Sequence, residues 1–235
     1  MVNSIEDIKK FINDKNFKKI FLLCGKKSFV TSGAEQLFKK IILEAESKLI
    51  YKKSELPILE ELIEIIIEIK NFRPDLILAI GGGAVIDYAK MANVVDVKPD
   101  LENLIRNYSY PFKKKFTKLA VIPTTAGSGA EVTSNAVIYL NGIKHSFESE
   151  LLTPDNFFLI PDFLISAPNK IKASAGFDAI AQALESIVSK KSNDQSVEYA
   201  SKALRISINS YIPFLNDPNT KNATEMAIAS NLAGK

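Results

Sequence analysis

Two stretches of small and hydroxyl-bearing residues each follow an apolar run that predicts a buried strand. Gly81-Gly82-Gly83 follows the run at 76–80, and the stretch at 123–133 follows the run at 119–122. Loops at the carboxyl ends of parallel strands form the ligand crevice of open α/β sheets. Because glycine lets backbone N–H groups approach a ligand closely, and a following helix favours negative charge at its N-terminus, these loops indicate a phosphate-binding site.

Taken together, the two loops predict a dinucleotide site. We expect backbone N–H groups of the first loop to lie under the pyrophosphate and hydroxyl groups of the second to donate to it. Neither loop has the G-x-G-x-x-G pattern, so a tight turn with close helix packing, and a Ser/Thr turn that satisfies its own backbone, remain alternatives. The predicted cofactor residues of the two loops are Gly82, Gly83, Ala84, Thr124, Thr125 and Ser128.

Three blocks of the chain resemble the iron-containing (group III) alcohol dehydrogenase family, which shares a superfamily with dehydroquinate synthase and glycerol dehydrogenase. Residues 81–90 are similar to the family's G-G-G-S-x-x-D-x-A-K, and residues 122–133 to its I-P-T-T-A-G-T-G-S-E-V-T. Residues 176–186 are similar to its G-x-D-A-x-x-H-x-x-E-x. The resemblance extends over nearly the whole chain, which corresponds to about the first two-thirds of a typical family member.

The resemblance implies an NAD- or NADP-dependent enzyme that transfers hydride between the nicotinamide and a small alcohol or aldehyde. It implies that Asp87 borders the cleft between cofactor and substrate, and that Lys144 reaches the cofactor. A structural alternative for Asp87 is a carboxylate in the first turn of a helix, where it complements the helix dipole. Residues 182–186 and 226–235 are most similar to the phosphonoacetaldehyde-reductase-like branch, which favours a small anionic aldehyde.

The choice between NAD and NADP depends on the end of the first predicted strand. Family members that favour NAD commonly have an aspartate there, which accepts a hydrogen bond from the ribose 2′-hydroxyl. This chain has Gly25 at that position, followed by Lys26 and Lys27. We therefore expect Lys26 to contact a 2′-phosphate and NADP to bind at least as well as NAD. The alternative is that both lysines are solvent-exposed loop charges.

The resemblance also implies a divalent metal, iron or zinc, held by one aspartate and three histidines. Asp178 matches the first ligand, but Gln182 replaces the histidine four residues later, and an amide oxygen is a weaker ligand than imidazole. The two remaining family histidines would lie beyond residue 235. We expect His145, the single histidine, to be an ordinary surface or turn residue on a predicted strand.

The incomplete ligand set leaves several interpretations open. The chain ends within a helical pattern, which favours a C-terminally truncated form of a longer enzyme. A nucleotide-binding pseudoenzyme, or an inactive fragment that lacks the metal-site histidines, is the first alternative. A dehydroquinate-synthase-like or glycerol-dehydrogenase-like enzyme is the second, although the hydroxyl-rich loop favours the alcohol dehydrogenase branch.

Predicted strands alternate with helices along the first two-thirds of the chain. A capping box at Ser4 and Asp7 starts the first helix, and the alternation demands right-handed crossovers in a doubly wound parallel α/β sheet. We expect this α/β domain to span residues 1–166 and an incomplete all-helical domain to span 167–235. The expected strands are 20–23, 49–51, 76–80, 118–122, a hairpin of 132–140 with 144–147, and 157–160; the late helices are 169–190, 195–211 and 220–232.

The composition excludes several classes of protein. Hydrophobic residues are 46% and charged residues 24% of the chain, proportions typical of a globular protein. The only compact basic run, Lys113–Lys115, is too small to predict a nucleic-acid partner, and no apolar run reaches the roughly 20 residues of a membrane span. Cys24 is the single cysteine, so no internal disulfide can form. We expect a cytoplasmic protein, with a homodimer as the assembly that the family suggests.

Overall fold

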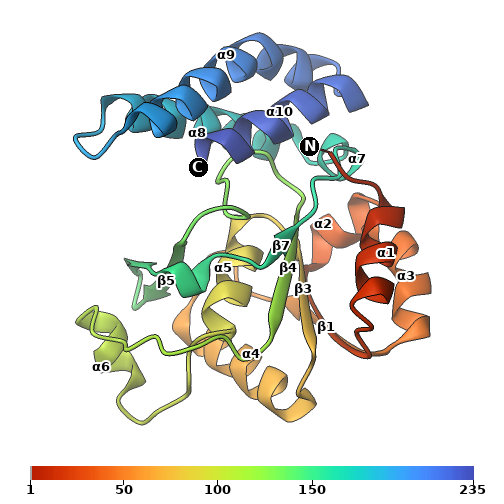
Figure 1. Ribbon diagram of the computed structural model, residues 1–235, viewed down its shortest axis with the longest axis vertical. Coiled ribbons are helices and arrows are strands. Elements are labelled where there is room, and N and C mark those ends of the chain that lie inside the picture. Colours follow the sequence, from red (N-terminus) through yellow and green to blue (C-terminus); the bar gives the residue numbers. More distant parts are fainter. Residues whose placement is uncertain (1) are drawn as a thin grey trace.

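The computed structural model describes residues 2–235, without the side chains of residues 40–44. Figure 1 shows a sheet with helices on both faces and a layer of helices across one end. The sheet is parallel throughout its described strands, with the spatial order β2-β1-β3-β4-β7. These strands are β1 (Lys19–Gly25), β2 (Glu46–Lys52), β3 (Leu76–Gly81), β4 (Lys118–Pro123) and β7 (Asn156–Phe157). The order reverses between β1 and β3, which creates the crevice predicted for a doubly wound fold.

Both faces of the sheet are buried, which is why its strands are continuous apolar runs rather than alternating ones. Leu22 and Cys24 of β1 point into one core, and Phe21 and Leu23 point into the other. The first core is covered by α1 (Ile5–Asp14), α2 (Lys26–Thr31) and α3 (Ala34–Glu44), the second by α4 (Leu59–Phe72) and α5 (Gly83–Ala92). The predicted capping box at Ser4 is confirmed.

Two predicted strands are shorter in the structure, for identifiable reasons. The hairpin consists of β5 (Asn135–Leu140) and β6 (Ile143–Glu148), joined by a turn with positive φ at Asn141 and Gly142. Its first strand does not begin at 132, because the chain is still in a turn there, with the Val132 N–H donating to the Gly129 carbonyl at 3.0 Å. The strand predicted at 157–160 ends at Phe157, because Leu159 exchanges hydrogen bonds with Asn3.

The layer across the end of the sheet consists of three long helices that sequence periodicity predicts. They are α8 (Asn169–Val188), α9 (Asp194–Asn216) and α10 (Thr220–Ala233), and capping boxes at Asn193 and Asn219 start the last two. α9 continues past Pro213, so its predicted end at 211 is wrong. Four short helical segments were not predicted: α2, α6 (Leu101–Arg106), η1 (Glu150–Leu152) and α7 (Asp162–Ile165). The division into domains at residue 166 stays a prediction.

None of the helices in the described part of the chain is both long and apolar enough to cross a membrane.

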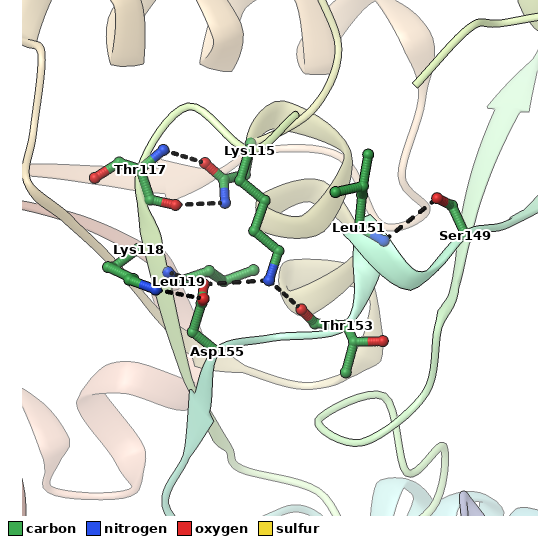
Figure 2. Close-up of polar contacts among 9 residues, drawn as sticks. Lys115, Thr117, Lys118, Leu119, Ser149, Leu151, Thr153 and Asp155 are labelled. Carbon is green, nitrogen blue, oxygen red and sulfur yellow. Dashed lines mark hydrogen bonds and ion pairs between the residues drawn. The ribbon is translucent and has the colours of Figure 1, made fainter. Parts of the chain in front are cut away.

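At the amino edge of the sheet, polar side chains are satisfied by the chain itself. Asp155, just before β7, accepts hydrogen bonds from the backbone N–H of Leu119 and the ammonium of Lys118, both at 3.0 Å, as Figure 2 shows. Lys115 lies 3.2 Å from the same carboxylate and donates to the Thr153 carbonyl. Burial acts to raise the pKa of Asp155, but these hydrogen bonds and lysines hold it below its usual value.

Candidate functional site

The two small-residue loops meet at the carboxyl edge of the sheet. We call residues 81–83 the glycine loop and residues 124–134 the hydroxyl loop. The N–H of Thr124 donates to the Gly81 carbonyl at 3.0 Å. A Cβ atom on Gly82 would lie 3.2 Å from the Thr125 hydroxyl oxygen, and one on Gly83 would lie 2.9 Å from the Ser128 hydroxyl oxygen. The structure therefore brings the predicted cofactor residues of both loops together, and the glycines permit the close approach.

The hydroxyl loop holds a polar atom that the chain does not satisfy. Thr124 is 2% exposed, and among the described residues its hydroxyl oxygen has no hydrogen-bond partner. A buried polar atom without a partner costs about 1–3 kcal/mol, which is a reason to look for a ligand or water beside it. The Ser/Thr-turn alternative applies in part to Ser128, whose hydroxyl accepts weakly from the Ala130 N–H at 3.4 Å.

The glycine loop leads directly into a helix N-terminus. α5 begins at Gly83, with Gly82 as its N-cap residue and no side chain capping its first turn. The first N–H groups of such a helix lack intrahelical partners and carry partial positive charge. Ala84 lies in this first turn and adds no bulky side chain. The helix end, the glycines and the neighbouring hydroxyls fit a pyrophosphate group.

The end of β1 adjoins the glycine loop, as the switch point requires. A Cβ atom on Gly25 would lie 3.6 Å from a methyl group of Val85 in α5. Lys26 and Lys27 are exposed, as the alternative expects, but they open the short helix α2 rather than lie in a loop. Lys52 of β2 is paired with Gly25 in the sheet and is a third lysine at this edge. Its ammonium already donates to the carbonyls of Ser54 and Glu55.

Asp87 is partly buried and lies among basic groups. Burial raises its pKa to about 6, while Lys90, the Val137 backbone and Lys144 act in the opposite direction. The structure thus places two predicted site residues, Asp87 and the exposed Lys144 of β6, in one electrostatic group. Asp87 occupies the second turn of α5 rather than the first, so its interpretation as a helix-dipole carboxylate is wrong.

Behind the loops lies a buried polar cluster to which the sequence analysis gave no role. Lys90 is completely buried, and its ammonium donates to the Thr133 carbonyl, the Thr133 hydroxyl and the Asn135 carbonyl at 2.9–3.0 Å. Glu131 is 3% exposed and accepts a hydrogen bond from the Asn231 amide at 3.0 Å. Lys90 and Glu131 lie within two of the blocks that resemble the family motifs, and this position could have indicated a role for them. No sequence motif singles out Asn231.

The predicted metal pair lies on one face of α8, toward the hydroxyl loop. The Gln182 amide nitrogen donates to the Asp178 carboxylate at 3.0 Å and to the Gly127 carbonyl at 3.3 Å. Gly127 packs so closely on α8 that a Cβ atom there would lie 2.6 Å from the Ala175 carbonyl oxygen. Among the described side chains, which exclude those of residues 40–44, no three from His, Cys, Asp or Glu are grouped to hold a metal ion. The described residues therefore do not fit the four-ligand set.

His145 corrects a further prediction. It lies on β6 as expected, but it is only 5% exposed, not a surface residue. Its ring lies 5.1 Å from that of Tyr108, on the same inward face of the strand as Phe147. The hairpin folds this face over the core, which buries whatever residue occupies the position.

The matched family is described as iron-containing alcohol dehydrogenase, and residues 2–161 match its profile. 1-Propanol dehydrogenase PduQ of Citrobacter freundii is 34% identical over 182 residues, which are 76% of this chain and 45% of that protein. 4-Hydroxybutyrate dehydrogenase of Clostridium kluyveri is 29% identical over 239 residues, which are 97% of this chain and 63% of that protein. The chain thus spans about half to two-thirds of the length of these relatives.

A similar solved structure is sulfoacetaldehyde reductase from Bifidobacterium kashiwanohense in complex with NAD+. It superimposes with a TM-score of 0.91 at 25% identity, over 100% of this chain and 63% of the reductase.

Proposed function

The chain belongs to the iron-containing alcohol dehydrogenase family, and from that premise we propose that it binds a nicotinamide dinucleotide at the carboxyl edge of its sheet. The proposed activity is reversible hydride transfer between the nicotinamide and a small alcohol or aldehyde. When bound, the nicotinamide supplies the hydride chemistry, and the protein positions and shields it.

A single observation carries the proposal: the glycine loop and the hydroxyl loop meet with room for no side chain between them. Gly82 and Gly83 leave the α5 N-terminus open to a phosphate, and Thr125 and Ser128 present hydroxyl groups beside them. The buried Thr124 hydroxyl, which lacks a partner among the described residues, is a further group that a nucleotide or an ordered water could satisfy. Asp87 and Lys144 would border the nicotinamide end.

For the cofactor, we propose that NADP binds at least as well as NAD. Gly25 supplies no carboxylate for a ribose 2′-hydroxyl, and the exposed Lys26 and Lys27 follow it directly. An ammonium group attracts the 2′-phosphate of NADP as a point charge.

For the substrate, we propose a small aldehyde that carries an acidic group. Two of the similar proteins that extend over nearly all of this chain are named for 4-hydroxybutyrate and sulfoacetaldehyde, and both compounds contain an acid group. This agrees with the sequence similarity of residues 182–186 and 226–235 to phosphonoacetaldehyde reductases. We also propose that the protein is cytoplasmic, which the single, buried Cys24 supports. The family resemblance supports a homodimer as its assembly.

A nucleotide-binding protein without turnover is the second candidate. The observation in its favour is that no three His, Cys, Asp or Glu side chains among the described residues are grouped to hold a metal ion. No step of the proposed activity is therefore assigned to a metal.

The experiment is a fluorescence titration with NADPH and NADH, followed by assays of aldehyde reduction with and without added iron or zinc. Saturable nucleotide binding with NADPH at least as tight as NADH supports the cofactor assignment. Turnover above that of an Asp178→Ala, Gln182→Ala control supports the enzyme. Binding without turnover supports the second candidate, and absence of binding by folded, monodisperse protein overturns both.

A further inference from the structure

We propose that Lys90 and Asn231 are positioning residues for the hydroxyl loop, which they hold from two sides in the arrangement that receives the nucleotide. The inference rests on the proposed function, because it assigns these residues to nucleotide binding without contact with the nucleotide.

Lys90 links the helix that follows the glycine loop to the end of the hydroxyl loop. It lies on α5, the helix that begins at the glycine loop, and its buried ammonium is bonded to three acceptors at the exit of the hydroxyl loop. An ammonium group has three donors, so these acceptors satisfy all of them. Any displacement of Thr133 relative to α5 would break at least two hydrogen bonds to a buried charge. The position of one loop is thereby coupled to that of the other.

Asn231 holds the same loop from the helical layer. It is 3% exposed on α10, and its amide bonds to the Glu131 carboxylate, which is equally inaccessible. Two neighbouring contacts bring α10 against Gly129. The Gly129 N–H donates to the Ser230 hydroxyl at 3.3 Å, and a Cβ atom on Gly129 would lie 2.8 Å from the Gly234 Cα. Gly129 also has a φ of +56°, which favours glycine. This segment is therefore fixed by α10.

The charges within the cluster support a holding role. Burial lowers the pKa of Lys90 to about 8, while Asp87 and Glu131 favour its charged form. Burial raises the pKa of Glu131, while the hydrogen bond from Asn231 and the charge of Lys90 act to lower it. Each group depends on the others, so removal of one leaves a buried polar atom without compensation.

The test measures loop mobility and nucleotide affinity in Asn231→Ala, with Asn222→Ala as the matched control. Asn222 lies on the same helix, is 6% exposed and bonds to the Asp217 carbonyl and the Asn219 N–H, away from the loop. Loss of the Asn231 bond should speed amide hydrogen exchange at 124–134 about tenfold and raise the dissociation constant for NADPH about tenfold. In Asn222→Ala, the exchange rate at 124–134 and the dissociation constant for NADPH should stay within about twofold of wild type. This comparison holds when the two variants lose the same amount of global stability.

Two further variants keep the test decisive. Glu131→Gln retains the acceptor for Asn231 and should rescue affinity relative to Glu131→Ala. Asn231→Asp preserves the side-chain shape but replaces the donor with a carboxylate facing Glu131, so it should mobilise the loop even if Asn231→Ala does not fold.

Unchanged loop exchange in Asn231→Ala, or equal effects in the Asn222→Ala control, would overturn the inference. If the wild-type protein binds neither NADPH nor NADH, the proposed function fails. Loop exchange still decides independently whether Asn231 holds the loop.

Discussion

The two edges of the parallel sheet use polar residues in opposite ways. At the amino edge, Asp155 accepts from the Leu119 N–H and two lysines, and Asp75 accepts from the N–H groups of Lys18 and Lys19 at 2.8 and 3.1 Å. At the carboxyl edge, glycines replace side chains, and the Thr124 hydroxyl has no partner in the described part of the chain. Polar groups satisfied by the chain stabilise the fold, and we propose that the open Thr124 hydroxyl belongs to the surface that receives a ligand.

The carboxylates show the same contrast. The pKa of Asp155 is lowered by its hydrogen bonds and neighbouring lysines, despite burial. The pKa of Asp87 is raised by burial to about 6, despite the lysines around it. An ionised Asp155 therefore stabilises the folded protein, and an ionised Asp87 destabilises it.

Removal of the Asp155 carboxylate should have the largest effect. Asp155→Ala leaves the Leu119 N–H and the partly buried Lys115 without their acceptor, and we expect a loss of about 3 kcal/mol in the free energy of unfolding at pH 7. Nucleotide affinity should stay within about twofold of wild type. Urea denaturation at several pH values measures the change, and the difference should shrink as the pH falls below 3.8, where the unfolded-state aspartate is protonated.

A side chain in the glycine loop should weaken nucleotide binding more than it weakens the fold. Gly82→Val keeps an allowed backbone, with φ of −76°, but adds its bulk beside the Thr125 hydroxyl. We expect NADPH affinity to fall at least about 100-fold, or about 2.8 kcal/mol, with a smaller loss of stability because the added side chain crowds Thr125. Fluorescence titration alongside thermal unfolding separates the two effects. Equal affinity in folded Gly82→Val protein would contradict the placement of the pyrophosphate.

Neutralising Asp87 should stabilise the protein. Because its folded-state pKa is raised from 3.8 to about 6, ionisation costs stability progressively as the pH rises through this window. We expect Asp87→Asn to be more stable than wild type at pH 7 by about 1–2 kcal/mol. The advantage should shrink as the pH falls from 6 towards 3.8 and disappear below that value, where the wild-type carboxyl becomes neutral in both states. Thermal unfolding from pH 4 to 7 measures it; a pH-independent difference would exclude this electrostatic cause.

Reversal of one charge beside Gly25 should have the smallest effect. Lys26→Glu is expected to weaken NADPH binding about tenfold, or about 1.4 kcal/mol, and NADH binding less than threefold. The exposed Lys10→Glu on α1 is a control for net charge. An equal loss for both nucleotides would remove the role of Lys26 in selecting the 2′-phosphate.

Local patterns predicted the parts of the fold that depend on local physics. The strand at 76–80 is a continuous apolar run, and the hairpin turn at Asn141-Gly142 matches a known turn dipeptide. Contacts between distant segments, such as Asn231 with Glu131, have no local pattern and could not be predicted. The burial of His145 could have been predicted from the sequence. It lies two residues from the buried Phe147, and the two-residue period of a strand places both side chains on one face.

Hydrogen exchange of the protein with and without saturating NADPH tests the contrast between the edges most directly. We predict slower exchange at residues 81–84 and 124–128, and unchanged exchange at 117–119 and 153–156. Protection confined to the amino edge, or absent from both loops, would contradict the assignment of the carboxyl edge as the nucleotide site.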